Sequence, residues 1–531
     1  MSRRLLTSMV CGLVGFSSLP IMAESRPKLV VGIVVDQLRT DYIEYLQDFF
    51  SQGGFRRLMR DGAYIRDLDF NVPAPDIASA TAIIQSGAYP RHNGITGAFV
   101  YNVSDKSVVP VFTDAAFIGN FSSETLSPGA LRVTTISDEL MAGNGRAAKI
   151  HSIAPDAAQA IILAGHDANS AFWINDNTGK WSSTTYYTGA PSLIQNRNYN
   201  NPLVSRLDTM KWTPLNPGVP YPDVPTKKIS EGFKYTFSRS DKDLFALYKQ
   251  TPLVNREITE IAIDYIRDLH LGENLDATDM LGIGFTLAPY PNISNSDGKY
   301  ELQDAYIRLD KNIESILNAI DKYVGLDNAL VYLTSTGYFN DNYTPQPESK
   351  VPGGIFSVKR AVSLLNSYLA AKFGNGSYID TYFDGHIFLD KSTIEEKNLN
   401  LNEIAEESRD FLVRMSGVAD AYTIPDLMSP AVAQLEGHRL ASDPKTSGDV
   451  ILEFNPGWKV TDDTRFPAID RKQKYTVFES PAFIYGGNVA PQLIEESVPA
   501  TAIAPTISKA LRIRAPNGAS DKPLNLKKKY K

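Results

Sequence analysis

Apolar runs alternate with amphipathic segments along most of this chain, and that alternation is typical of an α/β protein. Residues 29–36 form an uninterrupted, mostly β-branched run, as expected of a strand buried on both faces of a parallel sheet. Shorter apolar runs predict core strands near 279–285, 329–333 and 481–485. From 302 to 324 apolar residues recur at helical spacing, so we expect one face of a long helix to belong to the core.

The other segments are less regular. Helices are predicted near 40–60, 77–87, 355–373 and 401–415. The stretch from about 97 to 260 is rich in Tyr, Asn, Pro and Thr and contains hairpin-like pieces, so it interrupts the core pattern. With 531 residues, the chain is long enough for one elaborated α/β domain with a large insertion, or for two domains.

Asp36 is the first residue that indicates chemistry. It ends the first predicted strand, and open α/β sheets bind their ligands at the carboxyl ends of the strands. An aspartate in this place can also simply cap the next helix. Both readings stay open until the rest of the chain is compared.

Several short motifs occur in order along nearly the whole chain. They are Gly54-Phe55-Arg56-Arg57-Leu58, Val72-Pro73, Ser86-Gly87-Ala88-Tyr89-Pro90, Ala164-Gly165-His166, Asp304-Ala305-Tyr306-Ile307-Arg308-Leu309-Asp310 and Ser447-Gly448-Asp449-Val450. Together with residues 27–42 they resemble the alkaline phosphatase superfamily, most closely its phosphate-irrepressible periplasmic members, which are similar to type I phosphodiesterases and nucleotide pyrophosphatases. The resemblance implies a three-layer α/β sandwich with a central, mostly parallel sheet and an inserted cap region.

On this resemblance we divide the chain into five parts. Residues 1–23 are a signal peptide, 24–97 the first part of the α/β core, 98–260 the cap region with hairpins, 261–520 the second part of the core, and 521–531 a basic tail. In the resembled family the cap shapes access of the substrate to the site.

The resembled enzymes attack phosphorus with a threonine or serine. In this chain the nucleophile position falls at Asp76 when counted forward from Val72-Pro73, and at Ile77 when counted back from Ser86-Gly87. Neither side chain is a hydroxyl nucleophile. Ser79 and Thr81 lie close by in sequence, but a helix would have to rotate or shift by several ångströms to bring either hydroxyl into place.

The resembled family binds two zinc ions, and most of the implied ligand positions carry other residues here. The positions of one ligand loop fall at Pro289 and Ile293, which cannot bind zinc, and those of the next fall at Thr336 and Gly337. The last ligand aligns near Asp470. That leaves Asp36 as a remnant metal ligand.

Groups that would hold the phosphoryl oxygens are also replaced. The resemblance places Ala98 where the family has an asparagine, and Asp156 and Ala158 roughly where it has a lysine and an arginine. A carboxylate in place of a cation would repel a phosphate dianion. We therefore expect no catalytic residue and no bound cofactor at this site.

The histidines give a test that does not depend on the resemblance, because zinc hydrolases need clustered histidine and carboxylate ligands. The six are His92, His151, His166, His270, His386 and His438. No two of them are four residues apart, so we interpret them as structural or surface residues.

The N-terminal sequence and the composition indicate where the protein is located and which partners it excludes. Arg3-Arg4, an apolar stretch and Ala23 are typical of a secretory signal, through either the general or the twin-arginine route, so a periplasmic or otherwise exported protein is expected. Cys11 is the only cysteine, so the mature chain has no disulfide. The net charge of -7 argues against nucleic-acid binding, and no membrane span is expected beyond the signal.

Three functions remain open on the sequence. The first is an exported pseudoenzyme with a phosphohydrolase fold that binds a protein partner or small ligand. The second is a divergent phosphomonoesterase or phosphodiesterase with a site rebuilt from Asp36, Asp76 and Asp470 around one divalent cation such as Mg²⁺ or Ca²⁺. The third is a subunit that scaffolds a complex, for example with an active homologue.

Overall fold

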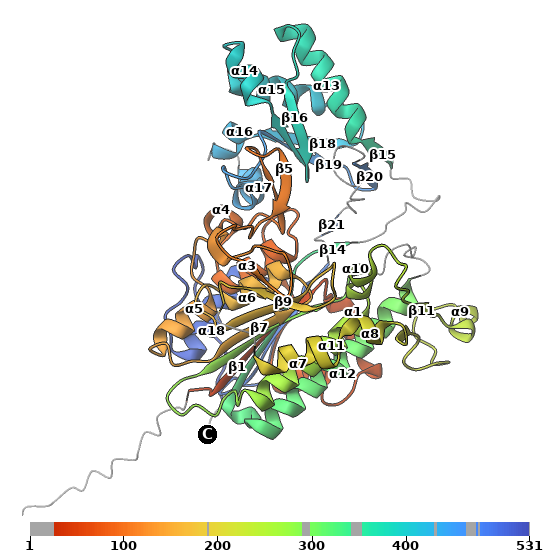
Figure 1. Ribbon diagram of the computed structural model, residues 1–531, viewed down its shortest axis with the longest axis vertical. Coiled ribbons are helices and arrows are strands. Elements are labelled where there is room, and N and C mark those ends of the chain that lie inside the picture. Colours follow the sequence, from red (N-terminus) through yellow and green to blue (C-terminus); the bar gives the residue numbers. More distant parts are fainter. Residues whose placement is uncertain are drawn as a thin grey trace, which may run out of the picture.

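The computed structural model describes residues 26–187, 191–288, 298–340, 353–429, 433–462, 474–475 and 478–529. Its centre is a ten-stranded sheet in the order β23-β2-β22-β13-β1-β12-β7-β8-β9-β6 (Figure 1). The strands are β1 (Leu29–Asp36), β2 (Ala63–Ile65), β6 (Gly119–Asn120), β7 (Ile150–Ala154), β8 (Ser170–Ile174), β9 (Trp181–Thr184), β12 (Asp279–Thr286), β13 (Ala329–Ser335), β22 (Ala482–Gly486) and β23 (Gln492–Ile494). The five central strands β13, β1, β12, β7 and β8 run parallel to one another.

β1 lies in the middle of the sheet, and all eight of its residues are buried. That position explains its continuous apolar sequence, since helices cover both faces of the sheet. Gly32 is needed at its centre because a Cβ there would lie 2.2 Å from the hydroxyl of Tyr332 on β13. The Tyr332 ring therefore lies across the β1 backbone.

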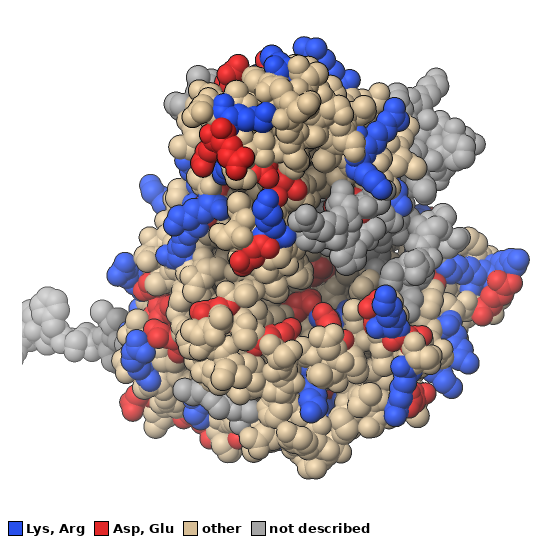
Figure 2. Space-filling model, turned by 45° about the horizontal axis from the view of Figure 1, so that its top comes forward, with Lys and Arg blue, Asp and Glu red and all other residues tan. Residues whose placement is uncertain are grey.

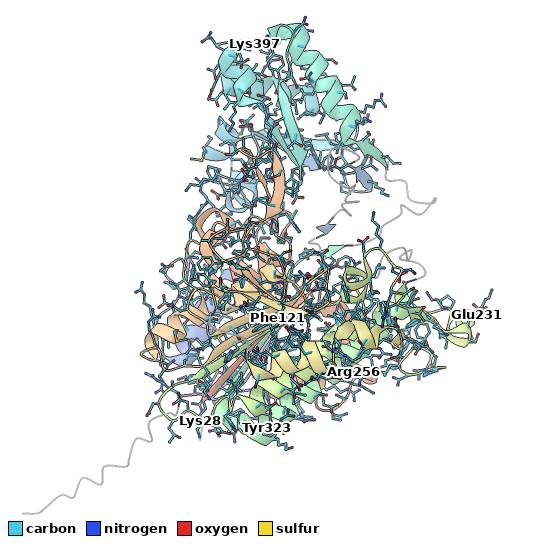
Figure 3. All side chains as sticks on the ribbon, viewed as in Figure 1. Lys28, Phe121, Glu231, Arg256, Tyr323 and Lys397 are labelled. Atoms are coloured by element: carbon cyan, nitrogen blue, oxygen red, sulfur yellow. The ribbon has the colours of Figure 1, made fainter. Side chains whose placement is uncertain are left out.

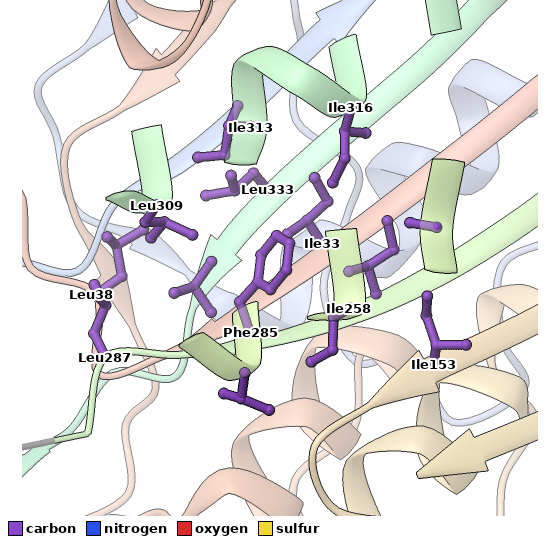
Figure 4. Packing of buried hydrophobic residues seen from close by; sticks show 14 of the residues in the cluster. Ile33, Leu38, Ile153, Ile258, Phe285, Leu287, Leu309, Ile313, Ile316 and Leu333 are labelled. Atoms are coloured by element: carbon purple, nitrogen blue, oxygen red, sulfur yellow. The ribbon is translucent and has the colours of Figure 1, made fainter. Parts of the chain in front are cut away.

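Two layers of helices enclose the sheet. Alternate β1 residues such as Ile33 pack with Phe285 against α11 (Pro252–Asp268) and α12 (Lys299–Tyr323), as Figure 4 shows. The other face, with Val34, packs against α3 (Ile77–Ser86), α5 (Ile136–Gly143) and α18 (Ile503–Leu511), beside α6 (Ala157–Ala164). This confirms the predicted three-layer α/β sandwich.

A second lobe stands above the carboxyl ends of the central strands (Figure 1). It is a four-stranded antiparallel sheet in the order β16-β17-β19-β18, with α13 (Val358–Phe373) and α15 (Leu401–Leu412) packed on it around a core of its own. Its strands are β16 (Ile379–Phe383), β17 (His386–Leu389), β18 (Val418–Thr423) and β19 (Val450–Phe454).

Shorter elements complete the chain. The helices are α1 (Thr40–Tyr45), α2 (Phe55–Asp61), α4 (Pro90–Asn93), α7 (Ser192–Asn200), α8 (Leu203–Leu207), α9 (Thr226–Glu231), α10 (Leu244–Lys249), α14 (Lys391–Glu396), α16 (Ile424–Met428) and α17 (Glu436–Ala441). The strands are β3 (Leu68–Asp69), β4 (Phe99–Asn102), β5 (Ser107–Pro110), β10 (Lys211–Trp212), β11 (Tyr235–Thr236), β14 (Phe339–Asn340), β15 (Gly354–Ser357), β20 (Trp458–Thr461), β21 (Lys474–Tyr475) and β24 (Val498–Pro499).

Three details differ from the sequence-based expectation. The range 98–260, expected to be a cap, supplies β6 to β9 to the central sheet, because β7 pairs in parallel with β12. The second lobe comes instead from within 261–520, the range expected to be core. The helix predicted near 40–60 is also divided into α1 and α2.

That division has a physical cause at Gly54. Asp310 of α12 accepts hydrogen bonds from the backbone N–H groups of Ser51 and Phe55, so its carboxylate starts α2 anew. A Cβ on Gly54 would lie 2.1 Å from Asp310 Oδ1.

At the ends of the chain, residues 1–25, with the expected signal peptide, lie outside the described residues. The described part of the basic tail reaches 529, and Lys528 forms a β-bridge with Val489. A search of the described helices finds none with the length and apolar character needed to cross a membrane.

Candidate functional site

Asp36 is the last residue of β1, beside Thr286 of β12, and Thr336 follows directly after β13. Figure 3 marks the direction of the strand: Lys28, just before β1, lies at the far end of the sheet, and Lys397 lies in the second lobe. β1 therefore runs toward that lobe. The candidate site is the edge of the sheet where the strands end, which is where open α/β sheets bind ligands.

Side chains of the protein hold the Asp36 carboxylate. Thr336 Oγ1 donates to Oδ1 at 3.1 Å, Gln37 Nε2 donates to Oδ2 at 3.2 Å, and the Tyr338 hydroxyl supplies another hydrogen bond. Asp36 is only 5 % exposed, and this burial raises its pKa to about 6, although the three donors act in the opposite direction. Asp36 is thus a buried, hydrogen-bonded carboxyl group.

The loop after β13 supplies two of these donors. Thr336 also accepts a hydrogen bond from the Gln37 backbone N–H at 3.0 Å, so it joins the ends of β1 and β13. Gly337 has a φ of +72°, and a Cβ on it would lie 2.1 Å from the Phe70 ring. Neither Thr336 nor Gly337, the residues expected at ligand positions, offers a side chain that binds zinc.

Asp76 and Ile77, the two candidates for the nucleophile position, lie at the start of α3. Asp76 is the N-cap, and its Oδ1 accepts from the N–H groups of Ala78 and Ser79, at 3.1 and 2.9 Å. Its Oδ2 accepts from the Ala98 N–H at 2.7 Å. The carboxylate is therefore tied to backbone donors from two segments.

The nearby hydroxyls are engaged as well. Ser79 Oγ donates to Asp76 Oδ1 at 2.9 Å and accepts from the Asp76 backbone N–H at 2.9 Å, which completes a capping box. Thr81 Oγ1 donates to the Ile77 carbonyl at 2.5 Å. Both side chains are buried in α3. Both hydroxyls are therefore engaged by groups at the start of α3.

Asp156, which stands roughly where the resembled family has a lysine, forms an ion pair. Lys249, at the end of α10, lies 2.5 Å from Asp156 Oδ1 and 2.7 Å from Asp176 Oδ1. Burial alone would lower the pKa of Lys249, but the two carboxylates outweigh it and raise that pKa. The Lys249 side chain is 9 % exposed against 44 and 57 % for its partners, so the carboxylates are the more exposed groups. Ala158, the other expected position of a cation, is the second residue of α6.

The hollow beneath the second lobe is acidic at its surface. Figure 2 shows red side chains gathered there, with lysine and arginine mostly on the surrounding rim. Asp36 and Asp156 raise one another's energy when both are ionised, since Asp156 contributes to the raised pKa of Asp36. An incoming phosphate dianion would meet the same repulsion.

The six histidines take structural or surface positions in the described chain. His166 bonds to Asp138 and to the Leu131 carbonyl, His151 to Ser170, His386 to the Gly448 N–H, His270 to Glu273, and His438 to Glu453, while His92 lies in α4. Among the described residues no three His, Cys, Asp or Glu side chains come together as a metal site would require.

These side chains do not fit the zinc centre that the resemblance implies. Asp36 has three protein donors and no histidine beside it, and zinc sites are built mostly from histidine and cysteine with some carboxylate. Pro289, Ile293 and Asp470 lie outside the described residues, so the positions expected for them stay predictions.

Sequence reasoning missed two residues that define the site. Tyr338 stands two positions after Thr336, one of the implied ligand positions, and that short spacing is the local signal that could have found it. Lys249 lies 93 residues from Asp156 in sequence, and no local pattern predicts that pair.

Comparisons with known proteins agree on the family. The sequence matches the model of the type I phosphodiesterase / nucleotide pyrophosphatase family over residues 30–479. It is 28% identical to the alkaline phosphatase PhoV of Synechococcus elongatus, over 94% of this chain and 92% of that protein. It is also 28% identical to a calcium-transporting ATPase of Myroides odoratus, over 98% of each chain.

A solved structure gives the same result at the level of the fold. The crystal structure of a variant of the alkaline phosphatase PafA superposes with a TM-score of 0.81 at 26% identity, and the match covers 94% of this chain and 98% of that one. The motifs, the ten-stranded sheet and these matches lead to one conclusion: the chain belongs to the type I phosphodiesterase / nucleotide pyrophosphatase family of the alkaline phosphatase superfamily.

Proposed function

We propose that this protein is a catalytically inactive member of its family, with a binding or scaffolding role. The observation that carries the proposal is the Asp36 carboxyl group, which is hydrogen-bonded by Thr336, Gln37 and Tyr338. A metal-ligating aspartate needs lone pairs directed at the ion, and here donors from the protein take three of the roughly four lone-pair sites of the carboxylate.

The start of α3 supports the proposal independently. A threonine or serine nucleophile needs an exposed hydroxyl near the metal, whereas Asp76 is a carboxylate held by the N–H groups of Ala78, Ser79 and Ala98. A carboxylate so held is a helix cap, and the N–H groups that could stabilise a phosphoryl oxygen are already occupied.

The negative charge of the site also supports the proposal of an inactive protein. Relatives such as PhoV are alkaline phosphatases by name, and that activity requires binding an anion. This site presents Asp36, Asp76 and Asp156, and its nearby cation Lys249 is held by two carboxylates. Because loss of a single oxyanion donor typically costs about 10²–10³ in rate, the combined loss of nucleophile, metal ligands and cations leaves no useful turnover.

The remaining role is then binding outside the cytoplasm. The expected signal in 1–23 directs export, and the retained fold with its second lobe offers surfaces for a protein partner, a small ligand or an active homologue. The partner's identity is left to pull-down experiments on the exported protein.

Two measurements on one sample test the proposal. Purified protein is incubated with zinc, magnesium or calcium, its metal content is measured by mass spectrometry, and hydrolysis of a phosphate monoester and a phosphate diester is then assayed. We expect less than a tenth of an equivalent of metal and hydrolysis at the rate of buffer alone.

The same assay identifies the alternative. A divergent hydrolase built on Asp36, Asp76 and Asp470 would bind about one equivalent of Mg²⁺ or Ca²⁺ and show turnover that depends on it. Loss of both in an Asp36→Ala variant, with both kept in a His92→Ala control, would replace the pseudoenzyme proposal by that one.

A further inference from the structure

The motif Ala164-Gly165-His166 takes no part in the candidate site, although it is one of those that carry the family resemblance. It follows α6 and lies against the start of α5. Gly165 permits this close approach, because its φ is +70° and a Cβ on it would lie 2.6 Å from Asp138 Oδ1. His166 is thereby placed beside Asp138, with 31 % of its side chain exposed.

Four donors besides the imidazole ring bond to the Asp138 carboxyl group. Its Oδ1 accepts from the backbone N–H groups of His166 and Asp167, at 2.6 and 3.1 Å. Its Oδ2 accepts from the backbone N–H and the hydroxyl of Thr135, at 2.8 and 3.0 Å. Burial alone would raise the pKa of Asp138, but His166 and the backbone donors outweigh it and hold that pKa below its usual range. Asp138 is therefore an ionised carboxylate, which can only accept hydrogen bonds.

Both ring nitrogens of His166 then carry a proton. Nδ1 lies 2.9 Å from Asp138 Oδ2, and Nε2 lies 3.0 Å from the Leu131 carbonyl oxygen, which also can only accept. A neutral imidazole has a single N–H and can serve only one of these two acceptors. The hydrogen bond to Asp138 accordingly raises the pKa of His166 above its ordinary 6.5, against the opposing effect of burial. The bonds in the structure are those of the imidazolium.

The other titratable and charged side chains near the ring come from the three segments packed around it. They are Glu139 of α5, Asp167 with its partner Arg146 at 3.2 Å, Tyr186 and Tyr187 after β9, and Arg132 next to Leu131. The two tyrosine hydroxyls donate to the backbone carbonyls of His166 and Gly165, at 3.0 and 3.1 Å. Asp138 is thus the charged group that bonds to the ring, and Asp167 adds a weaker attraction in the same direction.

The bond to Leu131 connects His166 to a segment that meets the second lobe. In this junction segment, residues 127–135, the Arg132 N–H donates to the Asn93 carbonyl of α4 at 3.0 Å, and the Arg132 guanidinium bonds to Asp443 at 2.5 Å. Asp443 is 1 % exposed and lies between α17 and β19, on the way into the second lobe. Figure 1 shows α4 beside α17 at this place, where the two helices are in contact.

We propose that His166 is a pH-sensitive link: its imidazolium holds the junction segment against α5, and loss of one ring proton loosens that segment and its contact with the second lobe. After deprotonation a single N–H remains, so either Asp138 or the Leu131 carbonyl loses its donor. Because the folded protein binds this proton more tightly, the link is complete below pH 6.5 and is lost as the pH rises through the raised pKa. The inference does not depend on the proposed function, since none of these residues belongs to the candidate site.

Hydrogen–deuterium exchange of the full chain, read by mass spectrometry, tests the link. Peptides of the junction segment are followed at pH 5.5 and pH 8.5 in wild type, His166→Gln and His270→Gln, and each rate is divided by the intrinsic exchange rate at that pH. His270 is the matched control, because its ring also bonds to a carboxylate, but to that of Glu273 in the same loop, at 3.0 Å.

In wild type and in His270→Gln we expect protection of the Leu131 and Arg132 amides to fall about tenfold or more between the two pH values. In His166→Gln protection should be low at both. Equal protection of the wild type at both pH values would overturn the inference, and so would a pH-dependent loss of the same size in His166→Gln.

A second measurement on the wild type covers the case in which His166→Gln does not fold. Exchange of the ring C2 hydrogen, followed by mass spectrometry over a series of pH values, titrates each histidine separately. His166 should titrate above 6.5, and protection of the junction segment should fall over the same pH range. A His166 that titrates at or below 6.5, or a segment that opens in another range, would overturn the inference. Neither result bears on metal content or ester hydrolysis, which test the proposed function.

Discussion

The substitution Asp36→Asn should stabilise this protein at neutral pH, which a metal-ligating aspartate would not allow. Asparagine keeps the size of the side chain and removes its charge. Its Oδ1 can still accept from Thr336, and its Nδ2 can donate to Gln37 if that side-chain amide turns over to present its oxygen. Tyr338 can rotate its hydroxyl in the same way. No buried group need be left without a partner.

The magnitude follows from the pKa of Asp36. A value of about 6 in the folded protein, against 3.8 for the ordinary residue, corresponds to about 3 kcal/mol. Because the folded-state pKa is raised, stability is highest below pH 3.8, falls as the pH rises, and has lost this amount above pH 6. Asp36→Asn should therefore gain about 1–3 kcal/mol at pH 7.5 and almost nothing at pH 3.5.

Urea unfolding followed by tryptophan fluorescence at the two pH values provides the measurement, with the slope against urea checked for equality. Asp310→Asn is the matched control. Asp310 is also fully buried, but its two oxygens accept from the backbone N–H groups of Ser51 and Phe55, which can act only as donors. An asparagine would set its own N–H groups against one of these donors, so this variant should be less stable than wild type. A loss of stability in Asp36→Asn at pH 7.5, accompanied by loss of bound metal, would refute the account of Asp36.

Three further variants test buried charged or titratable side chains elsewhere in the protein. Glu257→Gln should lower the free energy of unfolding by about 3–5 kcal/mol, measured in urea, because Glu257 is 2 % exposed and is the shared partner of two arginines. Lys249→Met should cost about 1–3 kcal/mol, since its carboxylate partners are partly exposed, and adding Asp156→Asn should recover part of that loss. Burial lowers the pKa of His151 to about 4, so the stability that it contributes above pH 6.5 is lost as the pH falls toward 4. The free energy of unfolding, measured in urea at several pH values over this range, should therefore fall less in His151→Asn than in wild type, by up to about 3 kcal/mol.

Much of the core could be predicted from the chain because its central strands are buried on both faces. The range predicted for the first strand coincides with β1, and those predicted near 279–285 and 329–333 differ from β12 and β13 by two residues or fewer. Continuous apolar sequence is the direct consequence of such burial. The edge strands β6 and β23 are two and three residues long and carry no comparable pattern.

The candidate site likewise has a part that could be predicted from local sequence and a part that could not. The places of Asp36 and Asp76 could be predicted, since a strand end and a helix cap have local signals. The partners of these carboxylates could not, because Thr336 lies 300 residues from Asp36 and Lys249 lies 93 from Asp156. Only the folded sheet brings such residues together.

The replacements at this site are coupled. Three carboxylates at the edge of a sheet would repel one another in an empty pocket, yet each has a partner of its own: hydroxyl donors for Asp36, backbone N–H groups for Asp76 and the Lys249 ammonium for Asp156. Restoring a single hydroxyl at position 76 would free N–H groups but leave Asp36 hydrogen-bonded to Thr336 and Gln37, and a carboxylate at position 156 that repels phosphate. On the proposed function, a return to catalysis would require several simultaneous changes, and a site satisfied in this way by its own side chains supports retention of the fold for binding.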